Sequence, residues 1–330
     1  MEQRRLGRLG SRVSAVGLGC MNIGGSYGAA DETETMRLFG RAVDLGINHF
    51  DTADIYGMGT SEEMIGKFLK RERPRLALAS KGGVRYVRAT GERFIDNSPA
   101  YLRQAIDNSL MRLGRDHIEL YYVHRREDSR PIEEVIDAMA TLKREGKIGA
   151  IGLSEVSPST LRRAHKIHPI AAIQSEYSLW TRLPERGMLE TCRELGISFV
   201  AFSPLGRGML TGNLPDPSSF SPRDLRKKNP RFAPGNYEKN AAAIAKFKAA
   251  AEAMERTPAE LAIAWVLAQG DNVLTIPGTR YERHLEGLVA GGELRLTESQ
   301  VRDIEAAFPE GFPWGERYAP QQSLGVESYE

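Results

Sequence analysis

Short apolar runs alternate along the chain with longer stretches whose apolar residues follow helical spacing. At four junctions an amphipathic helix ends in a glycine, and a short apolar strand begins one to three residues later. A glycine just past a helix end adopts the left-handed conformation without the steric penalty of a Cβ atom, so each junction predicts a helix end. The four glycines are Gly46, Gly114, Gly146 and Gly196. Regular alternation of helices and strands indicates a parallel sheet.

The apolar runs predict eight strands, near 14–20, 49–53, 76–80, 118–124, 150–154, 172–175, 199–203 and 273–276. Helical patterns fill most of the gaps, over 32–45, 61–70, 99–113, 132–145, 158–167, 185–195, 240–255 and 258–268. Eight strands that alternate with helices favour a closed (β/α)8 TIM barrel, with an open doubly wound sheet as the structural alternative.

The pattern continues from end to end without a shift in composition, so we expect a single domain over residues 1–330. Two segments lack periodicity. The first is a long loop after the seventh strand, over 211–236, and the second is an irregular C-terminal tail over 308–330. We expect the aromatic side chains of the tail to pack against the barrel: Phe312, Trp314, Tyr318 and Tyr329.

The composition excludes several classes of protein. Lys and Arg number 45 against 43 for Asp and Glu, and this near balance gives no electrostatic reason to expect nucleic acid or a membrane surface. The two cysteines, Cys20 and Cys192, provide no disulfide framework and fit a reducing, cytoplasmic location. No apolar run approaches the ~20 residues that span a bilayer. His165 and His168 have no carboxylate or thiolate nearby, so we expect no metal site.

In a parallel barrel, catalytic residues lie at the C-terminal ends of the strands, and polar residues stand at these positions in the predicted strands. Asp51, Tyr56, Lys81 and His124 follow three consecutive strands, so they converge on one mouth of the barrel. Asp51 and Lys81 could instead form a structural ion pair, and a lone histidine is more often a core residue than a catalytic one. The convergence of all four favours a site.

The four side chains fit together chemically. A tyrosine phenol has an ordinary pKa of about 10, and a nearby ammonium favours its ionised form. Asp51 would fix the position of Lys81, and His124 could orient a ligand or relay a proton. A carbonyl group held between Tyr56 and His124 would be polarised as negative charge develops on its oxygen.

Several motifs, in order along almost the whole chain, resemble those of the aldo-keto reductase superfamily. They are GLGCMNIGG (17–25), FDTADIYG (50–57), ASKGG (79–83), YYVHR (121–125), IGLSE (151–155), IQSEYSLWTR (173–182), FSPLGRGMLTG (202–212) and IPGTR (276–280). The last four resemble the bacterial and plant branch of pyridoxal-reductase-like and perakine-reductase-like enzymes.

This resemblance implies NADPH-dependent reduction of aldehydes and ketones to alcohols. Asp51, Tyr56, Lys81 and His124 match the catalytic tetrad of the family, with Tyr56 as the general acid. Further residues match positions that bind the nicotinamide and the pyrophosphate of NADPH. For the nicotinamide they are Ser154 and Gln174, with Phe202 as the stacking aromatic, and for the pyrophosphate they are Ser203, Leu205, Gly206, Arg207 and Gly208. Glu155 stands where many relatives have Asn.

Gly278, Thr279 and Arg280 match the segment that grips the adenosine 2′-phosphate, and His284 follows at helical spacing. A guanidinium there would favour NADPH over NADH through charge-assisted hydrogen bonds. The chain then departs from the family pattern LEEN, because Gly287 and Leu288 replace the second Glu and the Asn that contact adenine. The basic stretch 223–231 predicts either a solvated loop surface or a lid over the cofactor.

The expected partner is a small-molecule carbonyl substrate. The sequence gives no indication of the number of subunits. The candidate pocket residues are Met21, Asn22, Tyr86, Arg125 and Trp180, a wall compatible with aromatic or anionic compounds. The same residues leave two other functions open. A Schiff-base aldolase would use Lys81 as its nucleophile, although Asp51 would hold this lysine protonated. A cofactor-binding regulatory or sensor subunit of the same fold would show little turnover.

Overall fold

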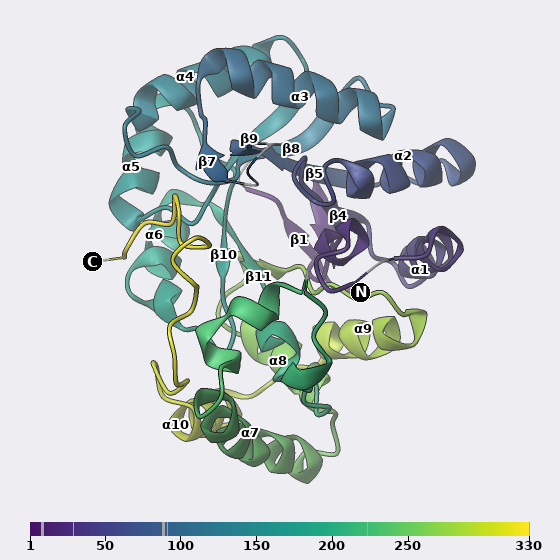
Figure 1. Cartoon of the computed structure of the whole chain (residues 1–330), viewed down its shortest axis with the longest axis vertical. Helices are drawn as coiled ribbons and strands as arrows, with labels where there is room; N and C mark the ends of the chain where they lie inside the picture. The colour runs from purple at the N-terminus through teal and green to yellow at the C-terminus, as the bar shows by residue number, and fades with distance from the viewer. Residues whose placement is uncertain (8–9, 29, 88–89, 91, 223, 330) are drawn as a thin grey trace.

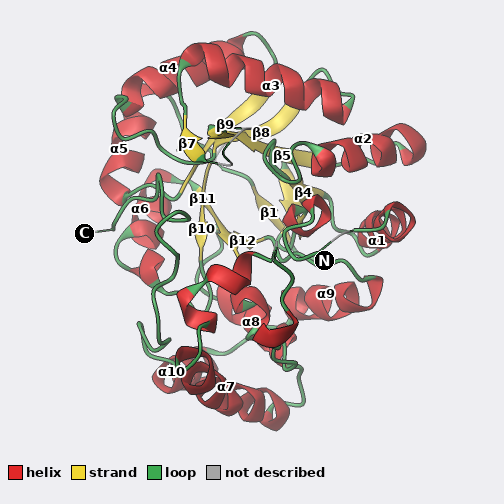
Figure 2. Ribbon diagram, viewed as in Figure 1, coloured by secondary structure: helices red, strands yellow, loops and turns green. Residues whose placement is uncertain are grey.

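A computed structural model describes residues 1–7, 10–28, 30–87, 90, 92–222 and 224–329. Parallel strands form a central sheet, and helices surround it (Figures 1 and 2). Neighbours in this sheet follow the order of the chain. The strands are β3 (Leu18–Gly19), β4 (His49–Asp51), β5 (Ala77–Gly82), β8 (Ile118–Val123), β9 (Ile148–Ser154), β10 (Ala172–Glu176), β11 (Ser198–Phe202) and β12 (Val273–Thr275).

The sheet closes into a barrel between its first and last strands. Val16, just before β3, forms a parallel bridge with Thr275 of β12. Backbone hydrogen bonds of 2.8 Å from Gly17 N to Thr275 O and 3.0 Å from Gly19 N to Pro277 O extend this junction. The predicted (β/α)8 barrel is therefore confirmed, and the open doubly wound sheet is excluded.

The predicted helices are present with small changes at their ends. All four predicted cap glycines have positive φ, between 62° and 82°. Two helices at the end of the chain, α9 and α10, were not predicted. The helices are α1 (Glu32–Asp44), α2 (Thr60–Glu72), α3 (Pro99–Leu113), α4 (Ile132–Arg144), α5 (Pro158–Ile167), α6 (Met188–Leu195), α7 (Asn236–Ala253), α8 (Pro258–Leu267), α9 (Leu285–Glu293) and α10 (Glu298–Ala307).

The barrel separates two packed layers. Tyr122 of β8 points into the barrel interior, while its neighbour Tyr121 packs among the helices, as expected for alternating side chains in a strand. Gly152 on the adjacent strand makes room for the Tyr122 ring, because a Cβ atom on Gly152 would lie 2.3 Å from ring carbon Cδ1. Tyrosine and glycine therefore fill this part of the interior together.

Two antiparallel hairpins are additions that the sequence pattern did not reveal. Strands β1 (Gln3–Arg5) and β2 (Arg12–Ser14) form the first, which buries Leu6 and Val13 among the residues of the barrel interior. The second joins β6 (Val84–Tyr86) to β7 (Arg93–Ile95), directly after β5. Each of these strands has three residues, too few to establish an alternating pattern.

The long loop and the tail lie beside each other on the barrel (Figure 1). The loop contains three single-turn 3-10 helices, η4 (Pro217–Ser219), η5 (Leu225–Lys228) and η6 (Pro230–Phe232). The tail has no helix or strand among its described residues, as predicted, and Glu330 lies outside them. Its aromatics pack as predicted except Trp314, which is 48% exposed. Asn240 binds its backbone, and the ammonium group of Lys239 lies 5.7 Å from the centre of its ring.

Candidate active site

Lys81 is the centre of the candidate site and is fully buried. Its Nζ forms an ion pair with the carboxylate of Asp51, which lies at the end of β4. The same nitrogen donates to Thr52 O at 2.7 Å and to Tyr56 Oη at 3.4 Å. Asp51 therefore directs the ammonium group of Lys81 toward the hydroxyl of Tyr56.

A third strand, β10, fixes the carboxylate of Asp51. Gln174 of β10 donates from Nε2 to the second carboxylate oxygen of Asp51 at 2.8 Å. Gln174 was expected to bind nicotinamide, and in the structure this hydrogen bond holds Asp51 in place. The contact indicates that Gln174 positions the ion pair.

The ionisation of these groups follows from burial and from their neighbours. Burial raises the pKa of Tyr56, and the nearby charge of Lys81 opposes part of this increase. Burial alone would lower the pKa of Lys81, but Asp51 and Tyr56 outweigh it, so the pKa of Lys81 is raised. Tyr56 is thus a neutral phenol next to a stable ammonium. A protonated Lys81 is a poor nucleophile, which argues against the Schiff-base aldolase.

His124 follows β8 and completes the predicted group of four. Its ring and the ring of Tyr56 meet edge to face, with centroids 5.8 Å apart and an interplanar angle of 85°. The pKa of His124 is well below its ordinary value because of burial and the charges of Arg125, Lys81 and Arg93. A neutral imidazole therefore faces the Tyr56 ring.

The glycine-rich segment after β3 supports Tyr56 from behind. A Cβ atom on Gly24 would lie 2.5 Å from the carbonyl carbon of Tyr56, so only glycine permits this approach. Ser61 Oγ donates to Cys20 O at 3.0 Å and accepts from Thr52 Oγ1 at 2.8 Å. These contacts connect the loop after β4 to the segment after β3.

The loop after β11, predicted to wrap a pyrophosphate, has an unusual backbone. Ser203, Gly206, Arg207 and Gly208 all have positive φ, between 52° and 102°. Consecutive residues of this kind turn backbone N–H groups toward one side, an arrangement that suits anions. Leu205 caps this turn, and Phe202 lies half-buried at the end of β11.

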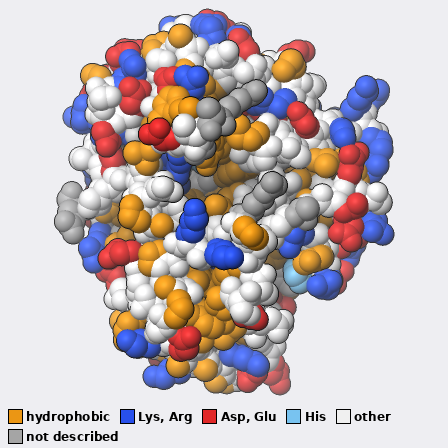
Figure 3. Space-filling model, viewed as in Figure 1, with side chains coloured by type: hydrophobic (Ala, Val, Ile, Leu, Met, Phe, Trp, Pro, Cys, Tyr) orange, Lys and Arg blue, Asp and Glu red, His pale blue; other side chains and the backbone are white. Residues whose placement is uncertain are grey.

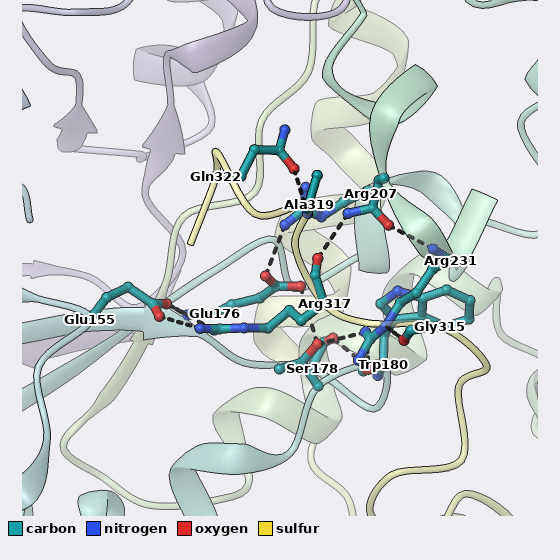
Figure 4. A network of polar contacts seen from close by, with 12 residues as sticks. Glu155, Glu176, Ser178, Trp180, Arg207, Arg231, Gly315, Arg317, Ala319 and Gln322 are labelled. Carbon is teal, nitrogen blue, oxygen red and sulfur yellow. Dashed lines mark hydrogen bonds and ion pairs between the residues drawn. The ribbon is translucent and has the colours of Figure 1, made fainter. Parts of the chain in front are cut away.

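Arg207 belongs to a buried charge network that the sequence did not reveal (Figure 4). Its Nη2 lies 2.9 Å from an oxygen of Glu176, at the end of β10. Glu155, at the end of β9, accepts two hydrogen bonds from Arg317 of the tail, at 3.1 and 2.6 Å. The positions of Glu155 and Glu176 at strand ends were a signal in the sequence, whereas nothing marked Arg317 as the partner of Glu155.

The segment after β12 holds the residues predicted to grip a 2′-phosphate. Thr279 Oγ1 lies 3.0 Å from Nδ1 of His284, and the Arg280 guanidinium lies against Gly28. Burial and Arg283 lower the pKa of His284, so its ring is uncharged near neutral pH. Leu288 is 3% exposed and packs in the core, so it offers no surface to a ligand.

The predicted pocket residues differ in exposure. Met21 and Asn22 are half-buried in the 3-10 turn η1 (Met21–Gly24), and Asn22 lies against Gly278. Tyr86 is 41% exposed on β6. Trp180 is 1% exposed, because Phe312 of the tail packs edge to face against its ring.

Ser154 and Arg125 meet at the mouth of the barrel. Arg125 Nη1 donates to Ser154 Oγ at 3.1 Å, so a residue predicted for nicotinamide contacts one predicted for substrate. The space-filling view shows a hollow near the centre of this face, with hydrophobic side chains inside it and basic side chains at its edge (Figure 3).

The basic stretch of the long loop is attached to the barrel. Leu225 N donates to Ser26 O at 3.3 Å, and the Arg226 guanidinium lies 4.8 Å from the centre of the Tyr27 ring. Arg231 donates to Trp180 O at 2.7 Å. Arg223, the first residue of this stretch, lies outside the described residues. These contacts favour the lid over a freely solvated loop.

Comparisons with known proteins agree with this geometry. The model of the aldo/keto reductase family matches residues 15–308. Aldo-keto reductase yakc [NADP(+)] of Schizosaccharomyces pombe is 41% identical over 313 residues, which cover 93% of this chain and 92% of the relative. Probable aldo-keto reductase 1 of Glycine max is 41% identical over 321 residues, 95% of this chain and 91% of its own.

A solved structure is also similar. The glycerol dehydrogenase AKR11B4 from Gluconobacter oxydans superposes with a TM-score of 0.84 at 32% identity. The match covers 93% of this chain and 96% of the dehydrogenase.

Proposed function

The chain belongs to the aldo/keto reductase family, and we propose that it reduces aldehydes and ketones to alcohols with NADPH. The observation that carries this proposal is the contact of Lys81 with both Asp51 and Tyr56. It places a neutral phenol and a fixed ammonium at the mouth of the barrel, where the carbonyl oxygen of a substrate gains negative charge during reduction.

In the proposed reaction, Tyr56 donates its hydroxyl proton to the carbonyl oxygen. The resulting phenolate is stabilised by the ammonium group of Lys81, which Asp51 holds in position. His124 remains neutral and orients the carbonyl group by a hydrogen bond. The nicotinamide of the cofactor would supply the hydride.

The residues available for NADPH fit its charged groups. The left-handed backbone from Gly206 to Gly208 suits the pyrophosphate, and Arg280 suits the 2′-phosphate. The name of the Schizosaccharomyces pombe relative includes NADP(+), which supports this cofactor. Buried Leu288 removes one family contact to adenine, so we expect weaker adenine recognition than in relatives that carry Asn there.

The first test replaces Tyr56 with Phe. Loss of the general acid should lower the turnover of a reactive aromatic aldehyde ~100-fold or more while NADPH binding stays nearly unchanged. Oxidation of NADPH, followed by its absorbance and run beside NADH, measures this effect. Tyr177→Phe is the matched control, since it also removes one hydroxyl, bonded to Glu185 at 2.9 Å.

Three outcomes separate the alternatives. Turnover that persists in Tyr56→Phe would remove Tyr56 from the mechanism. Tight NADPH binding without turnover of any aldehyde by the wild-type protein would favour the sensor subunit. Equal rates with NADH and NADPH would contradict the role of Arg280.

Two finer predictions accompany this function. We place the chain in the branch of pyridoxal-reductase-like and perakine-reductase-like enzymes, on the four motifs between 151 and 280. We also place it in the cytoplasm, because both cysteines are free, buried thiols. Among the described residues, no helix combines the length and the apolar character that crossing a membrane requires.

A further inference from the structure

Two arginines beside His124 have no acidic partner among the described residues. Arg125 is 8% exposed and donates from Nη1 to His124 O and Ser154 Oγ, whereas its buried Nε has no hydrogen-bond partner. The buried Nε of Arg93, on β7, has no partner either. Neighbouring arginines are paired, as Arg85 with Asp96 at 2.7 Å and Arg126 with Glu327.

The hairpin that carries Arg93 is fixed against the loop that carries Arg125. Asn97 N donates to Glu127 Oε2 at 2.7 Å, and Glu127 N donates to Asn97 Oδ1 at 2.8 Å. Gly325 of the tail packs against both elements, because a Cβ atom there would lie 2.9 Å from Arg125 Cβ and 3.2 Å from Ile95 Cγ1. The two guanidinium groups are therefore held on one wall.

This wall lies at the reacting end of the site. Burial lowers the pKa of His124, and the charges of Arg125 and Arg93 add to this decrease. Burial raises the pKa of Tyr56, and the charge of Arg125 opposes part of that increase. Arg125 further acts on Arg93, whose pKa is lowered by burial and by this like charge. Two like charges on one wall, with no carboxylate partner in the part of the chain that the structure describes, suit an anion.

The phosphates of NADPH would bind elsewhere and would not reach this wall. The segments proposed for them are the loop after β11 and the segment after β12, whereas Arg93 and Arg125 follow β6 and β8. An anion on this wall would therefore come from the substrate. A guanidinium matches the planar geometry of a carboxylate with two parallel hydrogen bonds.

We propose that the substrates are oxo acids, in which a carboxylate a few bonds from the aldehyde or ketone carbonyl binds Arg125 and Arg93. This proposal rests on the reductase function proposed above and names its substrate class. The bound carboxylate orients the carbonyl group of the substrate toward Tyr56 and His124. It also supplies the negative charge that the two buried guanidinium groups lack.

The experiment compares 4-oxobutanoate with its methyl ester, which differ in one charge. For the wild-type enzyme with NADPH, kcat/KM should be about tenfold or more higher for the acid. Arg93→Met should remove most of this ratio, and Arg93→Lys should restore part of it by returning the charge. Arg125→Met, which removes the second guanidinium, should also lower the ratio of kcat/KM for acid over ester. Arg85→Met, a paired arginine on the adjacent strand, should keep the wild-type ratio.

A binding measurement separates this proposal from the reductase function. Butanedioate has both carboxylate groups and no reducible carbonyl, so calorimetry with the NADPH complex reports the anion subsite without turnover. Binding that weakens in Arg93→Met supports the subsite even if no aldehyde is reduced. Equal kcat/KM for acid and ester, or a ratio that Arg93→Met leaves unchanged, would overturn it.

Discussion

A second buried carboxyl group lies close to the ion pair of Lys81 and Asp51, since Asp54 N donates to Lys81 O at 3.1 Å. Asp54 follows β4, its Oδ1 has no partner among the described residues, and Tyr101 Oη donates to its Oδ2 at 3.4 Å. Burial raises the pKa of Asp54 from 3.8 to about 8, and the nearby charge of Glu62 adds to the increase. At neutral pH this residue is therefore a protonated acid on the loop that carries Tyr56.

Asp54 should make stability depend on pH. Between about pH 4 and pH 8 the folded protein keeps a proton that the unfolded chain releases, so this group lowers the unfolding free energy as the pH rises. Asp54→Asn should remove this slope and gain stability over the wild type, by a few kcal/mol, toward pH 8. Denaturant unfolding at pH 5, 6.5 and 8 measures the difference.

The control for this prediction is Asp303→Asn, which removes a carboxylate at an exposed position of α10. If both variants respond to pH in the same way, the proton is not held at Asp54.

At the residue scale, the sequence predicted which side chains lie at the mouth of the barrel better than it predicted which of them contact each other. Asp51, Lys81 and Tyr56 could be brought together because strand ends converge in any parallel barrel. The pairing of Gln174 with Asp51 could not be derived, because a glutamine at a strand end suits a ligand and a neighbouring carboxylate equally well. Arg93 went unnoticed, because its strand is too short to leave a pattern.

At the scale of elements, two of the three glycines in α9 have opposite surroundings. A Cβ atom on Gly287 would meet no atom within 4 Å, whereas one on Gly291 would lie 2.7 Å from Glu260 O. Gly287→Ala should stabilise the protein by about 0.5–1 kcal/mol, since alanine loses less backbone entropy in a helix.

Gly291→Ala, in the same helix, is the matched control and should destabilise the protein through contact with α8. Thermal unfolding of both variants tests the contrast. Destabilisation by Gly287→Ala would show that this position needs glycine for another reason.

Helices α1 to α8 and the long strands were predictable because each repeats its pattern over several turns or alternations. Helix α9 was missed for a physical reason: its glycines lower helix propensity, and its stability comes from packing against α8. Propensity within a segment cannot reveal packing of this kind.

At the scale of the whole molecule, the tail is held to the barrel by buried charge. Arg317 pairs with Glu155, and these side chains are 13% and 1% exposed. Arg317→Met would leave a buried carboxylate without its counter-charge, which destabilises a protein by about 3–5 kcal/mol. Arg186→Met breaks an exposed pair with Glu310 of the same tail and should change stability by less than about 1 kcal/mol.

Equilibrium unfolding in urea compares the two variants. A loss for Arg317→Met no larger than that for Arg186→Met would contradict the anchoring role of the buried pair. The sequence could not predict this contact, since Arg317 and Glu155 are 162 residues apart and the tail has no periodic pattern.

The junction that closes the barrel has a consequence for its dynamics. The segment around β3 leads into the glycine-rich turn beneath Tyr56, and β12 leads into the segment proposed to grip the 2′-phosphate. The two are joined by the bridge between Val16 and Thr275 and a few backbone hydrogen bonds. A dinucleotide that contacts both segments would hold the first and last strands together. Tighter cofactor binding would therefore also make local opening of the barrel at this junction less favourable.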